Sequence, residues 1–280
     1  MVKILITGAS SYVGSKIYVD LKKKHDVIGT YEKNKLFPEL ISLDILNRDE
    51  VIRLTSKVKP SIIIHIAAIA SSVFVKQNPE LATKVNVDGT KNVVDAANLI
   101  NAKVIFMSSF AAAAIRPTTY AQSKIKGEEL VKETRNGYVI LRPSLVIGLS
   151  PNVTNDRLMN RVIDNITKKV PAIYDTSWKF QPTWLNQISE VIEKVIEKDI
   201  KNKIIHISLH ELVTRYDLTR DILSKFNIKV VPKDDNDTTP TFEVKQDDLK
   251  ELGIKSYSYN EMVDSIVKEL KQYLKKISLS

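Results

Sequence analysis

The stretch Val2-Lys3-Ile4-Leu5-Ile6-Thr7-Gly8-Ala9-Ser10-Ser11-Tyr12-Val13-Gly14 predicts a buried strand that turns directly into a helix. Glycine lets a backbone approach a ligand closely, and the start of a helix presents free N–H groups and a positive dipole end. A pyrophosphate is therefore expected at this turn. The spacing is Gly-x-x-Ser-x-x-Gly, with serine where the usual dinucleotide fingerprint has its middle glycine. An ordinary tight strand-to-helix turn is the alternative interpretation.

Short apolar stretches alternate with longer amphipathic ones through the first 148 residues. Strands are expected at 2–6, 26–31, 61–66, 104–107 and 138–141, and helices at 13–24, 47–58, 79–100 and 120–135. Near-continuous apolar strands separated by helices indicate a parallel sheet covered on both faces. Because such connections are right-handed, we predict a doubly wound (Rossmann) α/β fold. A strand at 204–207, after a helix at 186–199, is expected to rejoin the sheet.

The pattern changes after Gly148, where prolines and both tryptophans enter the sequence. Helices are expected near 155–169, 216–226, 246–252 and 259–276, with a polar loop at 232–240. We therefore expect a dinucleotide-binding Rossmann domain of residues 1–148, completed by the helix and strand of 186–207. Residues 149–185 and 208–280 would form a smaller, mostly C-terminal α/β substrate lobe. The two parts would be the walls of a cleft above the sheet.

Composition excludes several kinds of site in this chain of 280 residues. The absence of cysteine excludes disulfides, thiolate zinc sites and cysteine nucleophiles, and the four histidines show no metal-binding spacing. We expect no metal. The N-terminal apolar run is too short for a signal peptide, and no apolar segment is long enough to span a bilayer. A cytoplasmic protein without a membrane partner is expected.

The net charge of +9, with a pI near 9.4, raises the question of a nucleic-acid partner. The lysines are scattered over helix faces beside Glu and Asp, however, and form no stripe interleaved with aromatic residues. Solvated surface is the favoured interpretation, and no nucleic-acid partner is expected.

Tyr120 and Lys124 lie one helical turn apart on the same face of the helix expected at 120–135, eleven residues after Ser109. An ammonium group beside a phenol favours the phenolate and is expected to lower the pKa of Tyr120. Such a tyrosine can exchange a proton with a carbonyl or alcohol near neutral pH. Ser109 follows the strand at 104–107 and could hydrogen-bond the same oxygen.

The end of the second strand bears on the choice of cofactor. An acid there takes the ribose hydroxyls of NAD, but this chain has Tyr31, followed by Glu32 and Lys33. Lys33 or Lys35 could meet a 2′-phosphate, so NADP(H) is favoured over NAD(H). Asp44 is placed to meet the adenine edge, or else to cap the helix at 47–58.

An ordered set of motifs makes the chain resemble the extended short-chain dehydrogenases/reductases. The motifs are Thr7-Gly8 to Gly14, Lys59 to Ala68, Asn86-Val87-Asp88-Gly89-Thr90, Ser108-Ser109, Tyr120 to Lys124 and Leu141-Arg142-Pro143-Ser144. Within that family the chain is similar to the dTDP-4-dehydrorhamnose reductase branch, which includes the regulatory subunit of methionine adenosyltransferase. The features in common are Val27 to Tyr31, Lys59-Pro60 and Gln181-Pro182-Thr183.

The resemblance implies roles for individual residues. Tyr120 matches the catalytic tyrosine, Lys124 its partner on the nicotinamide ribose, and Ser109 the hydroxyl residue that polarises the substrate oxygen. Asn86 matches an asparagine that holds the proton-relay region. The residues expected to bind the cofactor are Gly8, Ser10, Ser11, Tyr12, Val13, Gly14, Tyr31, Lys33, Asp44, Ile45, Ala67, Ala68, Ala70, Asn86, Ser108, Tyr120, Lys124 and Pro143.

The residues around Ser109 favour reduction among the chemistries of the family. Phe110-Ala111-Ala112-Ala113-Ala114 offers no acid pair for a dehydratase, and the approach to Tyr120 is short for an epimerase. The resemblance thus implies an NAD(P)H-dependent reductase of a keto nucleotide sugar, most similar to the dTDP-4-dehydrorhamnose reductases. Arg157, Trp178 and Gln181 are the candidate substrate contacts.

Two alternatives remain open at this point. One is a regulatory subunit that binds NADP without turnover, like that of methionine adenosyltransferase. The other is a nucleotide-sugar epimerase of the same family. The resemblance also suggests a homodimer through the helices at 79–100 and 120–135. His65 is expected to pack or hydrogen-bond near the cofactor rather than to titrate.

Overall fold

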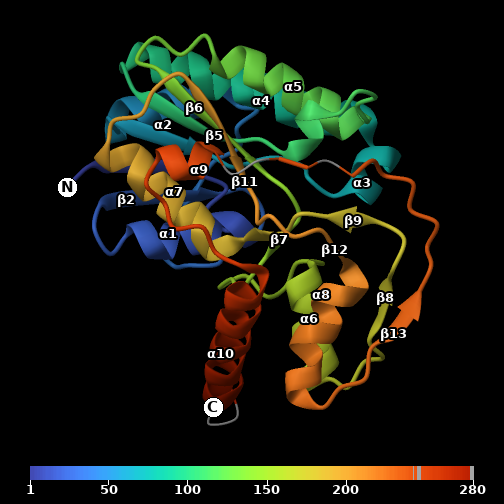
Figure 1. Cartoon of the computed structure of the whole chain (residues 1–280). Coiled ribbons are helices and arrows are strands. Elements are labelled where there is room, and N and C mark those ends of the chain that lie inside the picture. Colours follow the sequence, from blue (N-terminus) through green and yellow to red (C-terminus); the bar gives the residue numbers. More distant parts are fainter. Residues whose placement is uncertain (242, 245–246, 278–280) are drawn as a thin grey trace.

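A parallel seven-stranded sheet forms the centre of the molecule in the computed structural model, which describes residues 1–241, 243–244 and 247–277 (Figure 1). Its order is β11-β6-β5-β4-β1-β2-β3. The strands are β1 (Lys3–Thr7), β2 (Asp26–Tyr31), β3 (Ile41–Ser42), β4 (Ile62–His65), β5 (Lys103–Met107), β6 (Tyr138–Pro143) and β11 (Lys203–Ile207). The strand order reverses between β1 and β4, and such a switch point leaves a crevice at the carboxyl ends of the strands. The predicted fold class is confirmed.

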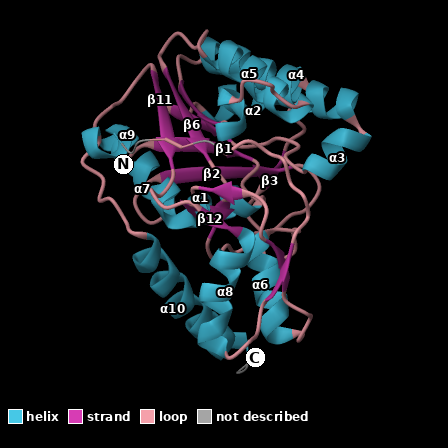
Figure 2. Ribbon diagram, turned by 45° about the vertical axis from the view of Figure 1, so that its right-hand side comes forward, coloured by secondary structure: helices cyan, strands magenta, loops and turns pink. Residues whose placement is uncertain are grey.

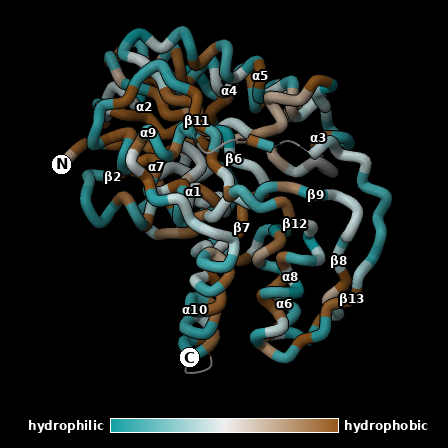
Figure 3. The backbone as a smooth tube through the Cα atoms, viewed as in Figure 1, coloured by the Kyte–Doolittle hydropathy of each residue, from teal (hydrophilic) through white to brown (hydrophobic). Residues whose placement is uncertain are grey.

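Helices cover both faces of this sheet, which is why β4 and β5 are buried along their whole length (Figures 1 and 2). On one face lie α2 (Arg48–Val58), α4 (Pro79–Leu99) and α5 (Thr119–Val131). On the other lie α1 (Tyr12–Leu21) and α7 (Leu185–Glu197). Apolar segments gather inside these layers and hydrophilic ones lie on the outside (Figure 3).

The second lobe lies beyond the α1 and α7 face and contains three longer helices (Figure 2). They are α6 (Leu158–Thr167), α8 (Arg215–Leu223) and α10 (Tyr259–Ile277). Its short strands pair as β7 (Val146–Ile147) with β10 (Thr183–Trp184), β8 (Ile173–Asp175) with β13 (Val231–Lys233), and β9 (Lys179–Phe180) with β12 (Val213–Thr214). Helix α9 (Asp247–Glu251) returns to pack on β11.

One apolar cluster runs from β1 through α7 into α8 and α10, so the two lobes have a common core. We propose that the chain divides as the sequence suggests, with 1–148 and 186–207 forming the Rossmann domain and the rest the second lobe. The strand β11 supports this division, because it pairs in parallel with β6 as the last strand of the sheet.

The structure moves several predicted boundaries and adds short elements. The helix expected from 155 begins only at Leu158, and the one expected to reach 24 ends at Leu21. The start of α9 was expected at residue 246, which lies outside the described residues. The sequence did not predict β3, α3 (Ser72–Gln77), or the 3₁₀ turns η1 (Phe110–Ala113) and η2 (Ser224–Phe226). Within the described part of the chain, no helix has both the length and the apolar character needed to cross a membrane.

Candidate active site

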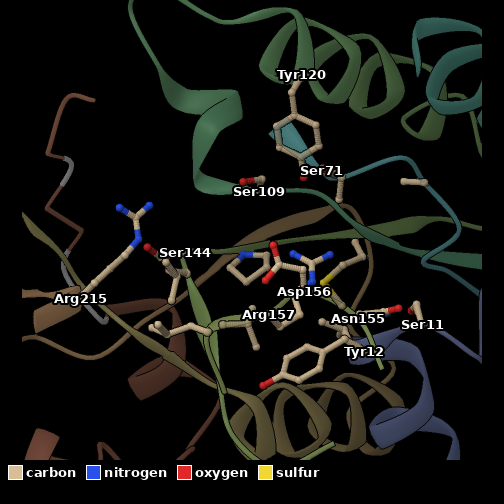
Figure 4. Close-up of a pocket in the computed structure, with 18 of the residues that line it drawn as sticks. Ser11, Tyr12, Ser71, Ser109, Tyr120, Ser144, Asn155, Asp156, Arg157 and Arg215 are labelled. Atoms are coloured by element: carbon tan, nitrogen blue, oxygen red, sulfur yellow. The ribbon is translucent and has the colours of Figure 1, made fainter. Parts of the chain in front are cut away.

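A cleft of about 680 Å³ opens at the carboxyl ends of the strands, between the sheet and the second lobe. It brings together eleven of the predicted residues, namely Ser11, Tyr12, Val13, Ala68, Ala70, Ser108, Ser109, Tyr120, Lys124, Pro143 and Arg157. Figure 4 shows Tyr120 extending from α5 toward Ser109 and Ser71, with Arg157 below it and Ser11 and Tyr12 farther along the cleft.

The turn after β1 is shaped for close approach of a ligand. Gly8 has φ +74°, and a Cβ there would lie 2.8 Å from the backbone nitrogen of Ala67, across the switch point of the sheet. A Cβ on Gly14 would lie 2.2 Å from the carbonyl oxygen of Gly8. Both glycines are therefore required by the turn itself. This cradle fits the pyrophosphate of a dinucleotide at the start of α1.

Side chains of the turn also serve the fold. Ser11 caps α1 by accepting a hydrogen bond from the backbone nitrogen of Gly14 (3.0 Å), so that N–H group is already used within the turn. Tyr12 is buried and donates its hydroxyl proton to the carbonyl oxygen of Gly148 (2.5 Å). From the neighbouring loop, Asn152 donates to the carbonyl oxygen of Ser10 (2.6 Å) and Ser150 to that of Tyr12 (2.7 Å). The second lobe thus clamps the turn.

Tyr120 lies in the first turn of α5, which begins at its N-cap Thr118. Burial raises the pKa of its phenol, while Arg157 and a hydrogen bond with Ser109 oppose that change. The sequence-based expectation that Lys124 lowers the pKa of Tyr120 is wrong for this structure. The ammonium of Lys124 forms its hydrogen bond with another group, and burial has the largest effect on the pKa of Tyr120. A phenol of raised pKa stays protonated at neutral pH, so Tyr120 carries its proton in the cleft.

Lys124 is only 3% exposed, and its ammonium lies 6.0 Å from the ring centre of Tyr120. Its ammonium donates to the carbonyl oxygen of Met107 at the end of β5 (2.8 Å) and lies 4.9 Å from the ring centre of Phe106. Burial lowers the pKa of Lys124 to about 8, and the negative charge of Glu128 opposes that shift. The side chain thus sits at the floor of the cleft with a pKa close to neutrality.

Asn86 holds the loop that follows β4. Its side chain accepts from the backbone nitrogen of Ile69 (2.8 Å), and its amide donates to the carbonyl oxygen of Ile69 (3.0 Å) and to the hydroxyl of Ser123 (3.0 Å). The loop carrying Ala67, Ala68 and Ala70 is therefore tied to α4 and α5. The positioning role that the resemblance implies for Asn86 stays a prediction.

His65 is fully buried between two threonines. Its ring nitrogens lie 2.7 Å from the hydroxyl of Thr7 and 3.0 Å from that of Thr90. Because Thr90 donates to the carbonyl oxygen of Asn86, it accepts from His65, which fixes the Nε2–H tautomer. Burial, helped by the charge of Lys124, lowers the pKa of His65 to about 3. His65 is thus a neutral hydrogen-bonding residue of the sheet edge.

The residues expected to bind the adenosine half lie outside the described cleft, near the ends of β2 and β3. Lys33 is 80% exposed and 3.6 Å from Glu32, while the ammonium of Lys35 lies over the ring of Tyr31. Asp44 accepts from the backbone nitrogen of Leu46 (2.9 Å), and Asn47 caps α2. The cap alternative for Asp44 is therefore wrong.

The predicted residues that do not line the cleft are Gly8, Ser10, Gly14, Tyr31, Lys33, Asp44, Ile45, Ala67, Asn86, Trp178 and Gln181.

Two of the expected substrate contacts are engaged in the second lobe. The amide of Gln181 donates to the carbonyl oxygens of His210 and Val244 and accepts from the backbone nitrogen of Val244. Trp178 packs on Phe180, with the guanidinium of Arg215 4.9 Å from its ring centre. These two residues build the wall of the lobe. Arg157, by contrast, is exposed on the cleft.

The sequence analysis missed part of the cleft wall, including Asp175 and Arg215. Asp175 is buried and accepts from Ser177 (2.9 and 2.5 Å), from Trp178 (3.2 Å) and from the backbone nitrogen of Asp235 (3.2 Å). Burial would raise the pKa of Asp175, but these hydrogen bonds hold it at about 2. Arg215 lies 3.4 Å from Asp175. The Asp-x-Ser spacing at 175–177, typical of a side-chain-capped turn, was the available signal.

Within the described residues, no group of three or more His, Cys, Asp or Glu side chains could hold a metal ion.

A family model described as the RmlD substrate binding domain matches residues 2–243. The chain belongs to this family. The predicted resemblance to the extended short-chain dehydrogenases/reductases and their dTDP-4-dehydrorhamnose reductase branch is confirmed.

Three proteins to which the chain is similar differ in their described activities. The dTDP-4-dehydrorhamnose reductase from Bacillus anthracis, solved in complex with NADP, superposes with a TM-score of 0.80 at 24% identity, covering 96% of this chain and 99% of that one. The methionine adenosyltransferase 2 subunit beta of Xenopus tropicalis is 24% identical over 81% of this chain and 72% of its own length. The GDP-6-deoxy-D-talose 4-dehydrogenase of Aggregatibacter actinomycetemcomitans is 27% identical over 73% of this chain and 74% of its own length.

Proposed function

We propose that the protein is an NADPH-dependent reductase of a 4-keto nucleotide sugar, similar to the dTDP-4-dehydrorhamnose reductases. The observation that carries this proposal is the meeting of Ser109, Tyr120 and Lys124 in one cleft with the glycine-rich turn of β1. Membership of the RmlD family supports it. A nicotinamide cofactor supplies a hydride when it is bound.

The residues of the cleft have separate tasks in this proposal. Tyr120 donates its phenolic proton to the carbonyl oxygen of the substrate, and Ser109 donates a hydrogen bond to the same oxygen. Lys124 binds the nicotinamide ribose from the floor of the cleft. Its positive charge also acts on the carbonyl oxygen of the substrate as that oxygen becomes a hydroxyl. The keto group thus gains one hydride and one proton and becomes a hydroxyl.

Arg157 is the proposed contact for the diphosphate of the nucleotide sugar. It lines the cleft together with Tyr120, and its charge opposes the raising of the pKa of Tyr120 by burial. Arg161 is less free for that task, because it makes two short hydrogen bonds to Asp156 (2.6 and 2.7 Å). We place the sugar between Arg157 and Tyr120.

The test is turnover of NADPH with a panel of 4-keto nucleotide sugars that differ in base and sugar. Oxidation of NADPH that requires one of them supports the proposal. A second candidate is favoured by the methionine adenosyltransferase 2 beta subunits among the similar proteins. In that case the chain binds NADP and alters the kinetics of a partner enzyme, with no turnover on any member of the panel.

The preference for NADPH gives a separate prediction at Lys33, which is exposed at the end of β2. Replacing Lys33 with Ala is expected to weaken NADPH binding about tenfold, because a charge-assisted hydrogen bond to the 2′-phosphate is lost. NADH binding should stay unchanged. Fluorescence titration of both cofactors measures this. The control is Lys23→Ala, which removes an exposed lysine just after the C-terminal end of α1, away from the glycine turn. Equal loss for both cofactors would contradict the assignment.

A further inference from the structure

A buried carboxylate in α5 contacts the cleft without lining it. Glu128 is 3% exposed, and Ser108, a cleft residue at the end of β5, donates its hydroxyl proton to it (2.5 Å). Arg142 of β6 donates from Nε (2.9 Å) and from Nη2 (2.6 Å), one bond to each carboxylate oxygen. Such a two-point contact with a guanidinium fixes the plane of a carboxylate.

The arginine is held from its far side as well. Its Nη1 lies 3.5 Å from Nε2 of His206, whose Nδ1 lies 3.2 Å from Asp248 of α9. Asp248 also accepts from the backbone nitrogen of His206 (3.0 Å). The chain of contacts from Asp248 to Ser108 crosses the neighbouring strands β11, β6 and β5, so Glu128 has little freedom to move.

Glu128 also lies one helical turn after Lys124, on the same face of α5. The titratable groups that face Lys124 are Glu128 and Tyr120 on its own helix and His65 on β4. His65 is neutral because of its burial, and Tyr120 is a protonated phenol at neutral pH. Glu128 is therefore the negative charge among these groups, and it opposes the lowering of the pKa of Lys124 by burial.

We propose that Glu128 is a positioning residue for the cleft: held by Arg142, it fixes the Ser108 hydroxyl and balances the charge of Lys124. This inference rests on the proposed function, because it assumes that Lys124 binds the nicotinamide ribose. It assigns to Glu128 an electrostatic task that acts through Lys124, beyond linking α5 to β6.

The pH dependence of NADPH binding tests the proposal. Lys124 carries its charge below a pKa of about 8 and loses it as the pH rises, so NADPH affinity should fall through that range in the wild-type chain. In Glu128→Gln the midpoint should lie about one pH unit lower, because a nearby opposite charge is removed. Fluorescence titration at a series of pH values gives the midpoint. NADH, which lacks the titrating 2′-phosphate, is titrated in parallel.

Two further variants separate this task from a structural one. Glu128→Asp keeps the charge and should restore the wild-type midpoint. Glu129→Gln makes the same change of charge at the exposed neighbouring position and should leave the midpoint unchanged. A Glu128→Gln protein whose affinity falls equally at every pH, with an unmoved midpoint, would overturn the proposal.

If Glu128→Gln does not fold, the double variant Glu128→Gln/Arg142→Met takes its place. Replacing both partners of a buried ion pair avoids an unpaired guanidinium and is often tolerated. The lost guanidinium charge opposes the effect of the lost carboxylate, so the midpoint should fall by less than in Glu128→Gln, because Glu128 is the charge that acts on Lys124. A midpoint at or above the wild-type value overturns the proposal. A wild-type chain that turns over no keto sugar contradicts the proposed function, yet the binding midpoints still decide the role of Glu128. A chain that binds neither cofactor contradicts both.

Discussion

Replacing Tyr120 with Phe is expected to lower kcat for the keto sugar by about a thousandfold, in the range that a positioned general acid contributes. The ring and its packing remain, while the hydroxyl that supplies the proton is lost. Because Lys124 donates to Met107 rather than to Tyr120, the floor of the cleft should keep its arrangement. NADPH affinity should therefore stay close to that of the wild type. Steady-state kinetics and cofactor titration on the same preparation measure both quantities.

The matched control is Tyr138→Phe. Tyr138 begins β6, at the opposite end of the sheet from the cleft, so the same loss of a hydroxyl should leave kcat unchanged. Turnover of Tyr120→Phe at the wild-type rate would remove the proposed proton donor. A parallel fall in kcat and in NADPH affinity would instead indicate damage to the cofactor site.

Gly14→Ala is expected to abolish measurable NADPH binding at ordinary cofactor concentrations. The new Cβ would lie 2.2 Å from the carbonyl oxygen of Gly8 and 2.8 Å from the hydroxyl of Ser11. The first of these is backbone and cannot rotate away, so the turn itself has to open. Overpacking of this kind also destabilises a fold by about 1–3 kcal/mol. Cofactor titration and thermal unfolding measure the two effects separately.

Gly253→Ala is the control that separates loss of stability from loss of the site. Gly253 has φ +67°, so alanine is strained there, but a Cβ would meet only the ammonium of Lys198 at 3.7 Å. This variant should lose about 1 kcal/mol of unfolding free energy and keep its NADPH affinity. If Gly14→Ala binds NADPH as tightly as the wild type, the assignment of the turn to the pyrophosphate is wrong.

The sheet could be predicted from the sequence because its strands have strong local signals. The runs Ile62–Ile64 and Val104–Met107 are apolar throughout, and only a strand covered on both faces is expected to be so. The short elements had no such signal. Ile41 and Ser42 of β3 are both exposed, and their pairing with β2 depends on tertiary contacts. The same holds for the strand pairs of the second lobe.

For the candidate site, spacing placed Tyr120 and Lys124 on one face of α5 correctly, because helical geometry alone determines that. Helical spacing gave the wrong direction for the pKa of Tyr120. The burial of the phenol and the hydrogen-bond partner of Lys124 depend on tertiary contacts outside the helix, such as the one with β5. The hydrogen bonds around Glu128 also could not be predicted from local sequence patterns. Glu128 and Arg142 lie on different elements, and Asp248 is far along the chain, so the network forms only when β5, β6 and β11 pair.

Transfer of deuterium from the cofactor to the sugar would show hydride transfer by this protein. The protein is incubated with a 4-keto nucleotide sugar and NADPH labelled with deuterium at the reactive carbon of the nicotinamide, and the sugar is analysed by mass spectrometry and NMR. We expect one deuterium per molecule at C4 of the product sugar, and almost none with Tyr120→Phe. Tight NADPH binding with no label in any sugar of the panel, by a well-folded wild-type protein, would contradict it.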